Sequence, residues 1–257
     1  DQLEQFGDVP RLVVQLLYNR GIAQADHMRQ FLSGQPYADS DPFQLKGMDT
    51  AVARLTAALR EGESIVVYGD YDADGVTATA LLVQTLSALG GQVRPYIPDR
   101  IEEGYGLNMT AVSRLAETGT RLLVTVDCGI RSVQEVSRAN QLGMQVIVTD
   151  HHTVGCELPP ALAIINPKQP DCPYPFKQLA GVGLAFKLAQ ALLRSVPHAG
   201  ALTEDELVDL VAVGTVADVA PLVDENRWLV LSGLDRLNHT PRLGLKALSE
   251  TAGIPVG

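Results

Sequence analysis

Three aspartates stand at alternate positions in the segment Gly69-Asp70-Tyr71-Asp72-Ala73-Asp74-Gly75. Held together in one small space, three ionised carboxylates repel one another strongly, and a bound cation removes that cost. A solvated turn is the alternative interpretation, because Asp and Gly are common turn residues. Taken alone, this segment is compatible with either a metal site or a turn.

Two further segments carry potential metal ligands. They are Asp127-Cys128-Gly129 and Asp150-His151-His152. Each has an ordinary alternative, since Asp127 could cap a following helix and a histidine pair could simply lie in a loop. Carboxylates with one or two imidazoles suit Mn²⁺ or Mg²⁺ better than a structural zinc, which favours thiolates. Two such ions sharing a carboxylate promote attack on phosphorus, so the reaction class indicated is phosphoester hydrolysis.

The elements around these segments decide between the alternatives. Short apolar runs predict strands, and residues with helical periodicity lie between the first four of them. The predicted strands are 64–68, 93–97, 122–126, 145–149 and 161–165; the predicted helices around them are 48–60, 76–89, 109–118 and 132–142. This alternation predicts an α/β fold with a parallel sheet of about five strands flanked by helices. The three ligand segments then meet at the carboxyl rim of the sheet, where functional groups gather.

The chain divides into three predicted parts. Residues 1–46 mix helical periodicity with breakers and predict a helical lead-in, and residues 47–175 form the α/β domain with the metal motifs. Residues 176–257 predict a smaller helical subdomain, with helices at 179–194, 204–214 and 227–238. That subdomain contains Asp218, a lone carboxylate in an apolar segment, which needs a partner. The alternative for Asp218 is a capping or salt-bridged role.

Composition sets limits on the partners of this chain. Its net charge of -10 argues against nucleic-acid binding unless the acidity is clustered to hold cations, which would themselves meet phosphate oxygens. The longest apolar stretch, 207–223, is interrupted by Asp209 and Asp218, which argues against a membrane span. Three widely spaced cysteines predict neither a disulfide framework nor a zinc knuckle and favour a reducing cytoplasm. The start at Asp1, without a signal-like succession, favours an excised piece of a cytoplasmic protein.

Other candidate motifs fail on their context. The run Gly181-Val182-Gly183 starts like a dinucleotide fingerprint, but Phe186 stands where the third glycine should be, so these glycines are expected to permit close packing. The chain has no GxxxxGK[ST] phosphate loop. Cys128 has no dedicated base in the sequence, which argues against a nucleophilic role. His198 and His239 lie away from the predicted rim and are expected at the surface.

Taken in order, four segments resemble the motifs of the DHH phosphoesterase superfamily. They are Val67–Gly75, Val126–Ile130, Val148–His152 and Gly214–Asp218. Within the superfamily the chain is similar to RecJ-like exonucleases, through the segments Pro98–Leu107, Leu179–Phe186 and Glu225–Arg227. This resemblance runs from about residue 10 to the end.

The resemblance implies a role for each residue of the site. Asp72 and Asp127 would hold one ion; Asp74, Asp127, His151 and Asp218 would hold the other, with Asp127 bridging. Asp70 and Asp150 would orient these ligands, and His152 would contact the scissile phosphate or assist the leaving oxygen. Arg100 and Arg227 would meet phosphate or structural carboxylates. These are the expected roles in catalysis, substrate binding and metal binding.

The implied activity is 5′ to 3′ exonuclease digestion of single-stranded DNA in repair and recombination, with two Mn²⁺ or Mg²⁺ ions. Single-strand binding protein and a helicase are implied as partners, without a membrane. One alternative is a hydrolase of short oligonucleotides, cyclic dinucleotides or pyrophosphate, and another is a non-catalytic replisome scaffold. The family also carries a DHH-associated domain and often an OB-fold after this core, which puts tight DNA binding by this chain in doubt.

Overall fold

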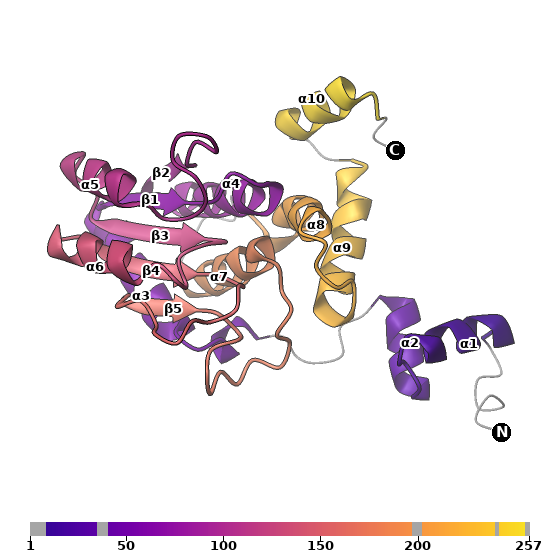
Figure 1. Cartoon of the computed structure of the whole chain (residues 1–257). Coiled ribbons are helices and arrows are strands. Elements are labelled where there is room, and N and C mark those ends of the chain that lie inside the picture. Colours follow the sequence, from indigo (N-terminus) through magenta and orange to yellow (C-terminus); the bar gives the residue numbers. More distant parts are fainter. Residues whose placement is uncertain (1–8, 35–40, 197–201, 240–241, 255–257) are drawn as a thin grey trace.

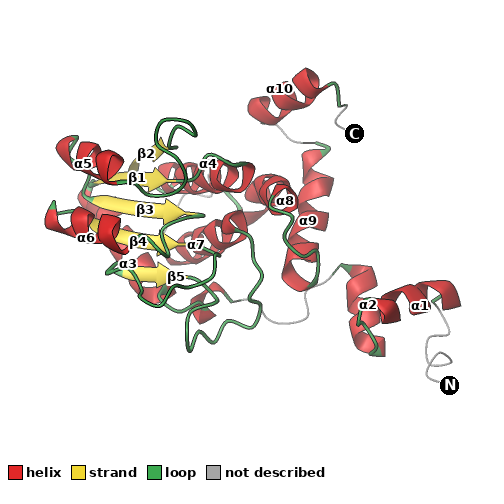
Figure 2. Ribbon diagram, viewed as in Figure 1, coloured by secondary structure: helices red, strands yellow, loops and turns green. Residues whose placement is uncertain are grey.

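The core of the protein is a parallel sheet. The structure is a computed structural model, and it describes residues 9–34, 41–196, 202–239 and 242–254. Five strands pair in the order β2-β1-β3-β4-β5, every pair parallel (Figures 1 and 2). The strands are β1 (Ser64–Tyr68), β2 (Gln92–Tyr96), β3 (Leu122–Val126), β4 (Gln145–Thr149) and β5 (Ala163–Ile165). The predicted α/β class and strand number are confirmed.

Helices cover both faces of the sheet, because its central strands are apolar on both sides. On one face α5 (Met109–Glu117) and α6 (Val133–Gln141) pack on Val66, Leu123 and Val146. On the other face lie three helices that pack on alternate residues of the same strands. They are α3 (Met48–Glu61), α4 (Ala73–Ala88) and α7 (Gly181–Ser195).

The chain ends in helices that pack on α4 and α7. The short 3-10 helix η3 (Glu204–Leu207) leads into α8 (Val208–Ala217), which packs against α4, α7 and α9 (Asp224–Leu237). A single apolar cluster extends from Leu45 through the sheet to Leu229, so these helices share the core of the sheet. The predicted division into three domains stays a prediction. After α9 comes α10 (Leu243–Ala252), which the sequence analysis did not identify.

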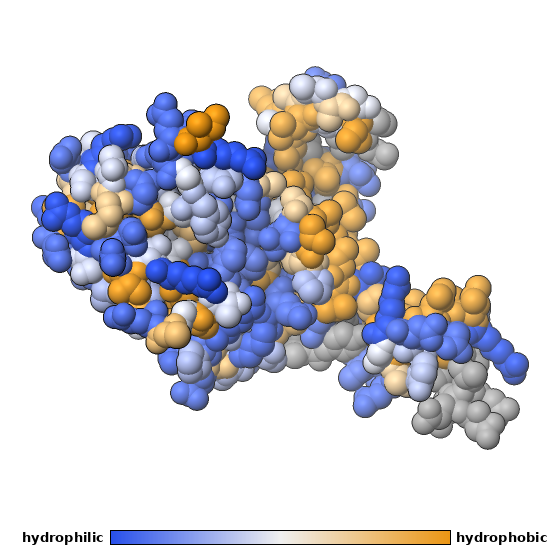
Figure 3. All heavy atoms as spheres, viewed as in Figure 1, coloured by the Kyte–Doolittle hydropathy of each residue, from blue (hydrophilic) through white to orange (hydrophobic). Residues whose placement is uncertain are grey.

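The helices α1 (Arg11–Asn19) and α2 (Ala25–Ser33) form a small unit with its own apolar cluster of Val14, Leu17, Met28 and Phe31. Hydrophobic side chains are exposed over α9, α10 and α1, among them Leu234, Leu243 and Leu12 (Figure 3). None of the helices in the described ranges combines the length and the apolar character needed to cross a membrane.

Candidate metal centre

The turn from β1 into α4 places its three aspartates in different environments. Asp70 is fully buried at the end of β1, while Asp72 is the exposed N-cap of α4, accepting a hydrogen bond from the Gly75 N–H at 2.9 Å. Asp74 therefore lies in the first helical turn, where it is 1% exposed. The helix begins at Ala73 rather than at 76 as predicted, since the Asp72 cap lets an acidic turn start a helix.

The carboxylate of Asp74 is held by the amino end of α7. Gly181 N–H donates to its Oδ2 at 2.7 Å, and Val182 N–H donates to its Oδ1 at 2.8 Å. The two amide donors are free for this because the first turn of a helix leaves N–H groups without internal partners. Sequence reasoning assigned these glycines to close packing alone and missed this contact; the amino end of a glycine-rich helix is the signal that could have revealed it.

Asp127 follows β3 in a left-handed conformation, with φ 60°. Its N–H donates to the Thr149 carbonyl at 3.0 Å, which fixes it beside β4. Gly181 lies directly against it, and a Cβ on that glycine would be 2.6 Å from the Asp127 Oδ1. The helix-capping alternative for Asp127 is wrong, since α6 begins at Val133 with Ser132 as its N-cap residue.

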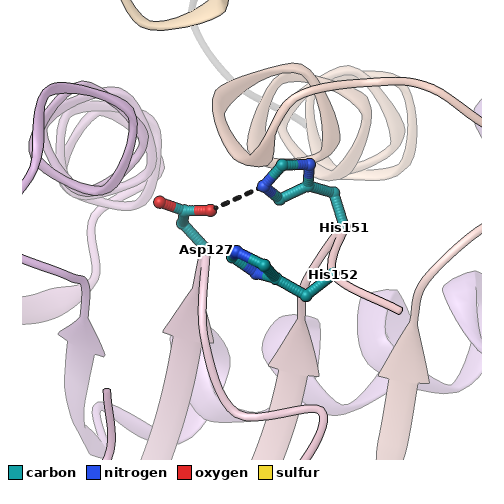
Figure 4. Close-up of side chains that lie close together, drawn as sticks. All are labelled: Asp127, His151 and His152. Carbon is teal, nitrogen blue, oxygen red and sulfur yellow. Dashed lines mark ion pairs between the residues drawn. The ribbon is translucent and has the colours of Figure 1, made fainter. Parts of the chain in front are cut away.

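His151 points from the turn after β4 toward Asp127 (Figure 4). Its Nε2 lies 3.1 Å from the Asp127 Oδ1 and 3.9 Å from the Asp74 Oδ2, and its Nδ1 lies 3.9 Å from the Asp218 Oδ2. The facing Nε2 and Oδ1 atoms are buried and lack the geometry of a hydrogen bond, and neither has another such partner among the described residues. Buried acceptors of this kind are costly unless a donor or a cation meets them.

Burial governs the ionisation of this group. Desolvation, together with the charges of nearby carboxylates, raises the pKa of Asp127 to about 9 and that of Asp74 to about 7. Desolvation also lowers the pKa of His151, which favours the neutral ring with a free lone pair. The site thus combines buried carboxylates, whose negative charges repel one another, with a neutral imidazole. This set of ligands fits a divalent cation, because the positive charge of the cation offsets the repulsion between the carboxylates.

His152 lies beside His151, with the ring centroids 4.4 Å apart, and pairs with Asp150. Its Nδ1 lies 2.7 Å from the Asp150 Oδ1, and its N–H donates to the same oxygen at 3.0 Å, while Ile130 N–H donates to Oδ2 at 2.9 Å. Burial works to raise the pKa of Asp150, but the His152 hydrogen bond and charge outweigh it and hold that pKa below its usual value. The same hydrogen bond raises the pKa of His152.

Asp218 reaches the site from the end of α8. It is the residue after the last helical turn, and burial raises its pKa. Val219 follows it in a left-handed conformation, φ 58°, although its side chain is 85% exposed. A β-branched residue rarely adopts this backbone conformation, so the turn is strained beside a functional carboxylate.

Five of the predicted site residues form two overlapping ligand groups. They are Asp127, His151 and His152 in one, and Asp74, His151 and Asp218 in the other, with the ligand atoms of each group within 4.8 Å of one another. Asp70 and Asp72 belong to neither group among the described residues. Asp72 still acts on the site, because its charge raises the pKa of Asp127. The roles of all these residues remain predictions.

The two predicted arginines lie in different surroundings. Arg100 is exposed and lies over the ring of Tyr71, 5.2 Å from its centroid, and Tyr71 meets Tyr105 edge to face. Tyr105 in turn contacts the ring of His152, so Arg100 connects to the site through aromatic side chains. Arg227 instead donates from Nε to the Phe31 carbonyl at 2.9 Å, which ties α9 to α2. That contact is structural, and a substrate role for either arginine stays a prediction.

Two further residues hold the histidine turn and were missed from the sequence. Asn166 donates from its side chain to the His152 carbonyl at 2.9 Å, and Lys168 donates from Nζ to the His151 carbonyl at 2.5 Å. Both follow β5, at the same rim as the ligands. The position of Asn166 immediately after the fifth predicted strand is the signal that could have identified it.

Cys128 and two histidines were not expected to take part in catalysis, and the structure describes Cys128 and one of these histidines. Cys128 is 1% exposed and burial raises its pKa well above the usual range, which disfavours a reactive thiolate. His239 is exposed. His198 lies outside the described residues.

Comparisons with known proteins agree with this geometry. The N-terminal domain of the DHH family matches residues 64–215. The single-stranded-DNA-specific exonuclease RecJ of Bacillus subtilis (strain 168) is 51% identical over 96% of this chain, and that of Escherichia coli (strain K12) is 44% identical over 95%. The chain spans 30% and 44% of the length of these two relatives.

Solved structures show the same fold. A crystal structure of exonuclease RecJ bound to manganese superposes with a TM-score of 0.72 at 46% identity, covering 81% of this chain and 52% of that one. RecJ from Thermus thermophilus in complex with Mn²⁺ superposes with a TM-score of 0.78 at 38% identity, covering 98% of this chain and 35% of that one. The matched domain covers all five strands, the ligand segments that follow β1, β3 and β4, and α7. The chain therefore belongs to the DHH family.

Proposed function

We propose that this chain is the catalytic core of a metal-dependent 5′ to 3′ exonuclease that hydrolyses phosphodiester bonds in single-stranded DNA. The observation that carries the proposal is the pair of facing buried acceptors, Asp127 Oδ1 and His151 Nε2, within 3.1 Å. Such a pair is costly unless a proton or a cation meets it, and carboxylates with an imidazole suit a divalent cation. The names of the relatives supply the substrate class.

The residues that would hold two Mn²⁺ or Mg²⁺ ions are those of the two ligand groups, with Asp72 as a further ligand. Asp127 is suited to bridge, because it lies between the Asp72 turn and His151. Bound divalent ions supply Lewis-acid polarisation of a phosphoryl group and neutralise charge in the transition state. Asp70 and Asp150 are proposed to orient the ligands, since both are buried and lie within two residues of a predicted ligand, and Asp150 holds the His152 ring.

His152 is proposed to act on the substrate itself. Asp150 holds its Nδ1, and its Nε2 lies 3.3 Å from the Tyr105 hydroxyl, which a phosphate oxygen or a leaving oxygen would replace. Since the Asp150 hydrogen bond raises the pKa of His152, the ring retains a proton more readily near neutral pH and can deliver it to the departing oxygen. In the reaction a water oxygen bonds to phosphorus and gives up a proton to solvent, the phosphorus–oxygen bond of the strand breaks, and the departing oxygen takes up the proton of His152.

The substrate, partners and location of the whole protein are part of this proposal. The net charge of -10 gives this chain little general attraction for DNA, so tight binding requires the regions that its longer relatives possess. Single-strand binding protein and a helicase are proposed partners. We propose a cytoplasmic location, supported by the absence of disulfides among the described cysteines, all of which are free.

The test is hydrolysis of single-stranded oligonucleotides labelled at the 5′ or the 3′ end, in Mn²⁺ or in excess EDTA, alongside a labelled dinucleotide. The proposal expects metal-dependent release of the 5′-terminal nucleotide from the long strand and loss of that activity in Asp127→Asn. Cleavage of the dinucleotide alone would favour the hydrolase of short oligonucleotides. Equal activity in EDTA would rule out the metal mechanism.

A further inference from the structure

We propose that Asn226 is a positioning residue for the metal centre. Its buried carboxamide would fix the positions of both Asp74 and Asp218. The inference rests on the proposed metal function and deepens it. Asn226 lies in the first turns of α9, is fully buried, and contacts no ligand atom itself. Its effect on the site is indirect, through two backbone segments.

The carboxamide of Asn226 joins these two segments. Its Nδ2 donates to the Gln178 carbonyl at 2.6 Å and to the Pro221 carbonyl at 3.1 Å. A carboxamide nitrogen has two N–H donors, and here each meets one carbonyl. The Oδ1 has no hydrogen-bond partner among the described residues. The hydrogen bonds of this side chain are therefore the two that its Nδ2 donates.

Each of the two carbonyls belongs to a segment that fixes a carboxylate of the same ligand group. Gln178 leads into the start of α7, where Gly181 and Val182 donate their N–H groups to the Asp74 carboxylate. Pro221 lies in the turn that begins at Asp218. Asp74 and Asp218 come together with His151 in one ligand group. Asn226 therefore links the two backbone segments that hold the carboxylates of this group.

The turn after Asp218 needs such a restraint because its backbone is strained and its surface packing is sparse. Val219 and Asp224, at either end of the turn, have φ values of 58° and 45°, a region that residues other than glycine rarely adopt. Val219, Leu222 and Val223 are 85%, 43% and 38% exposed, so their side chains do little to anchor the turn, and the small side chain of Ala220 packs on the core. Strain of this kind persists only where surrounding contacts enforce it.

Replacement of Asn226 should therefore loosen Asp218 and weaken the site. Residues that orient metal ligands from behind typically contribute a factor of about 10 to 100 in metal affinity. We expect Asn226→Ala to weaken Mn²⁺ binding at the Asp74, His151 and Asp218 group by such a factor. Asn226→Ser, which retains one donor, should fall between Asn226→Ala and the unchanged chain.

A matched control exists in α6. Asn140 also donates from its side-chain Nδ2 to a proline carbonyl, that of Pro160, at 2.7 Å, but it lies at the surface and away from the ligands. Asn140→Ala removes the same chemical contact without touching the site. It should leave Mn²⁺ binding unchanged.

The experiment is calorimetric titration of the metal-free chain with Mn²⁺, supported by the Mn²⁺ electron paramagnetic resonance spectrum and by thermal unfolding of each variant without metal. We expect weaker binding of one ion in Asn226→Ala, recovery of hydrolysis at saturating Mn²⁺, and no change in Asn140→Ala. A purely structural role would lower the unfolding temperature without shifting Mn²⁺ affinity, and added Mn²⁺ would not restore the rate.

Two outcomes separate this inference from the proposed function. If the unchanged chain binds Mn²⁺ and both Asn226 variants, folded, bind it equally well, the positioning role is wrong while the metal site stands. If the unchanged chain binds no Mn²⁺ at all, the metal site is wrong and the inference falls with it. Should Asn226→Ala fail to fold, Asn226→Ser carries the same comparison.

Discussion

His152 and Asp150 form a bonded pair in which the ring Nδ1 lies 2.7 Å from the carboxylate Oδ1. The carboxylate is 2% exposed and is also fixed by the Ile130 N–H, so it cannot follow the ring if the ring moves. This arrangement sets both the orientation and the ionisation of His152. It therefore gives a direct test of the role assigned to that histidine.

Asp150→Asn should lower the pKa of His152, because it removes the carboxylate whose hydrogen bond and charge favour the protonated ring. The raised pKa of His152 contributes stability that is complete below about pH 6.5, the ordinary value for histidine, and is lost as the pH rises through the value in the folded chain. The contribution of Asp150, whose pKa is lowered, is lost as the pH falls through that lowered value. Proton resonances of the ring, followed against pH in the metal-free chain, measure the change. Asp26→Asn, at a 90% exposed carboxylate, is the control and should leave His152 unchanged.

Asp127→Asn should stabilise the metal-free chain while abolishing its response to Mn²⁺. Burial raises the pKa of Asp127 to about 9, so ionising it costs stability progressively as the pH rises from about 4. The variant should match the unchanged chain near pH 4 and exceed it at pH 8 by at least about 1 kcal/mol. Asparagine also tolerates the left-handed backbone at this position.

Thermal unfolding at both pH values, with and without Mn²⁺, measures these differences. Mn²⁺ should raise the unfolding temperature of the unchanged chain, because it binds the folded state, and should have little effect on Asp127→Asn. A variant that is less stable than the unchanged chain at pH 8 without metal would show that Asp127 is held by contacts other than those described.

Gly181→Ala should displace Asp127 and reduce Mn²⁺ affinity at least about tenfold, since the new methyl group would lie 2.6 Å from the Asp127 carboxylate. Alanine suits a helix better than glycine, so helix propensity cannot account for a loss. Gly183→Ala, in the same helix, brings a methyl group 3.2 Å from the flexible end of Leu179 and should be tolerated. Equal Mn²⁺ affinity in the two variants, measured by calorimetry, would contradict the close contact at Gly181.

Val219→Gly should stabilise the chain by about 1 kcal/mol, because it removes a left-handed β-branched residue whose side chain is 85% exposed. Val216→Gly is the matched control. It lies at the exposed end of α8 in helical conformation, where glycine should cost roughly 0.5 kcal/mol. Denaturant unfolding of both variants measures the change in the free energy of unfolding, which should be positive for Val219→Gly and negative for Val216→Gly. A loss of stability in Val219→Gly larger than that in Val216→Gly would show that the valine side chain has a packing role.

Much of the site could be predicted from the sequence, because parallel strands carry their following residues to one edge. Asp127 and Asp150 come directly after a strand and Asp70 comes two residues after one, and alternation of strands and helices is a local pattern that periodicity reveals. The same pattern predicted the number of strands, while their ends differed by one or two residues at β2 and β5. The pattern also brought His151 and His152 to the rim.

Only the tertiary structure decided how these residues divide their tasks. The contacts of Asp74 with Gly181, of Asn226 with Gln178, and of His151 with Asp218 join positions far apart in the chain. Such contacts depend on how α7, α8 and α9 pack on the sheet, which periodicity does not specify. The types and order of the ligands are local properties of the sequence, whereas their pKa values and distances follow from burial, and burial exists only once the helices have closed over the rim.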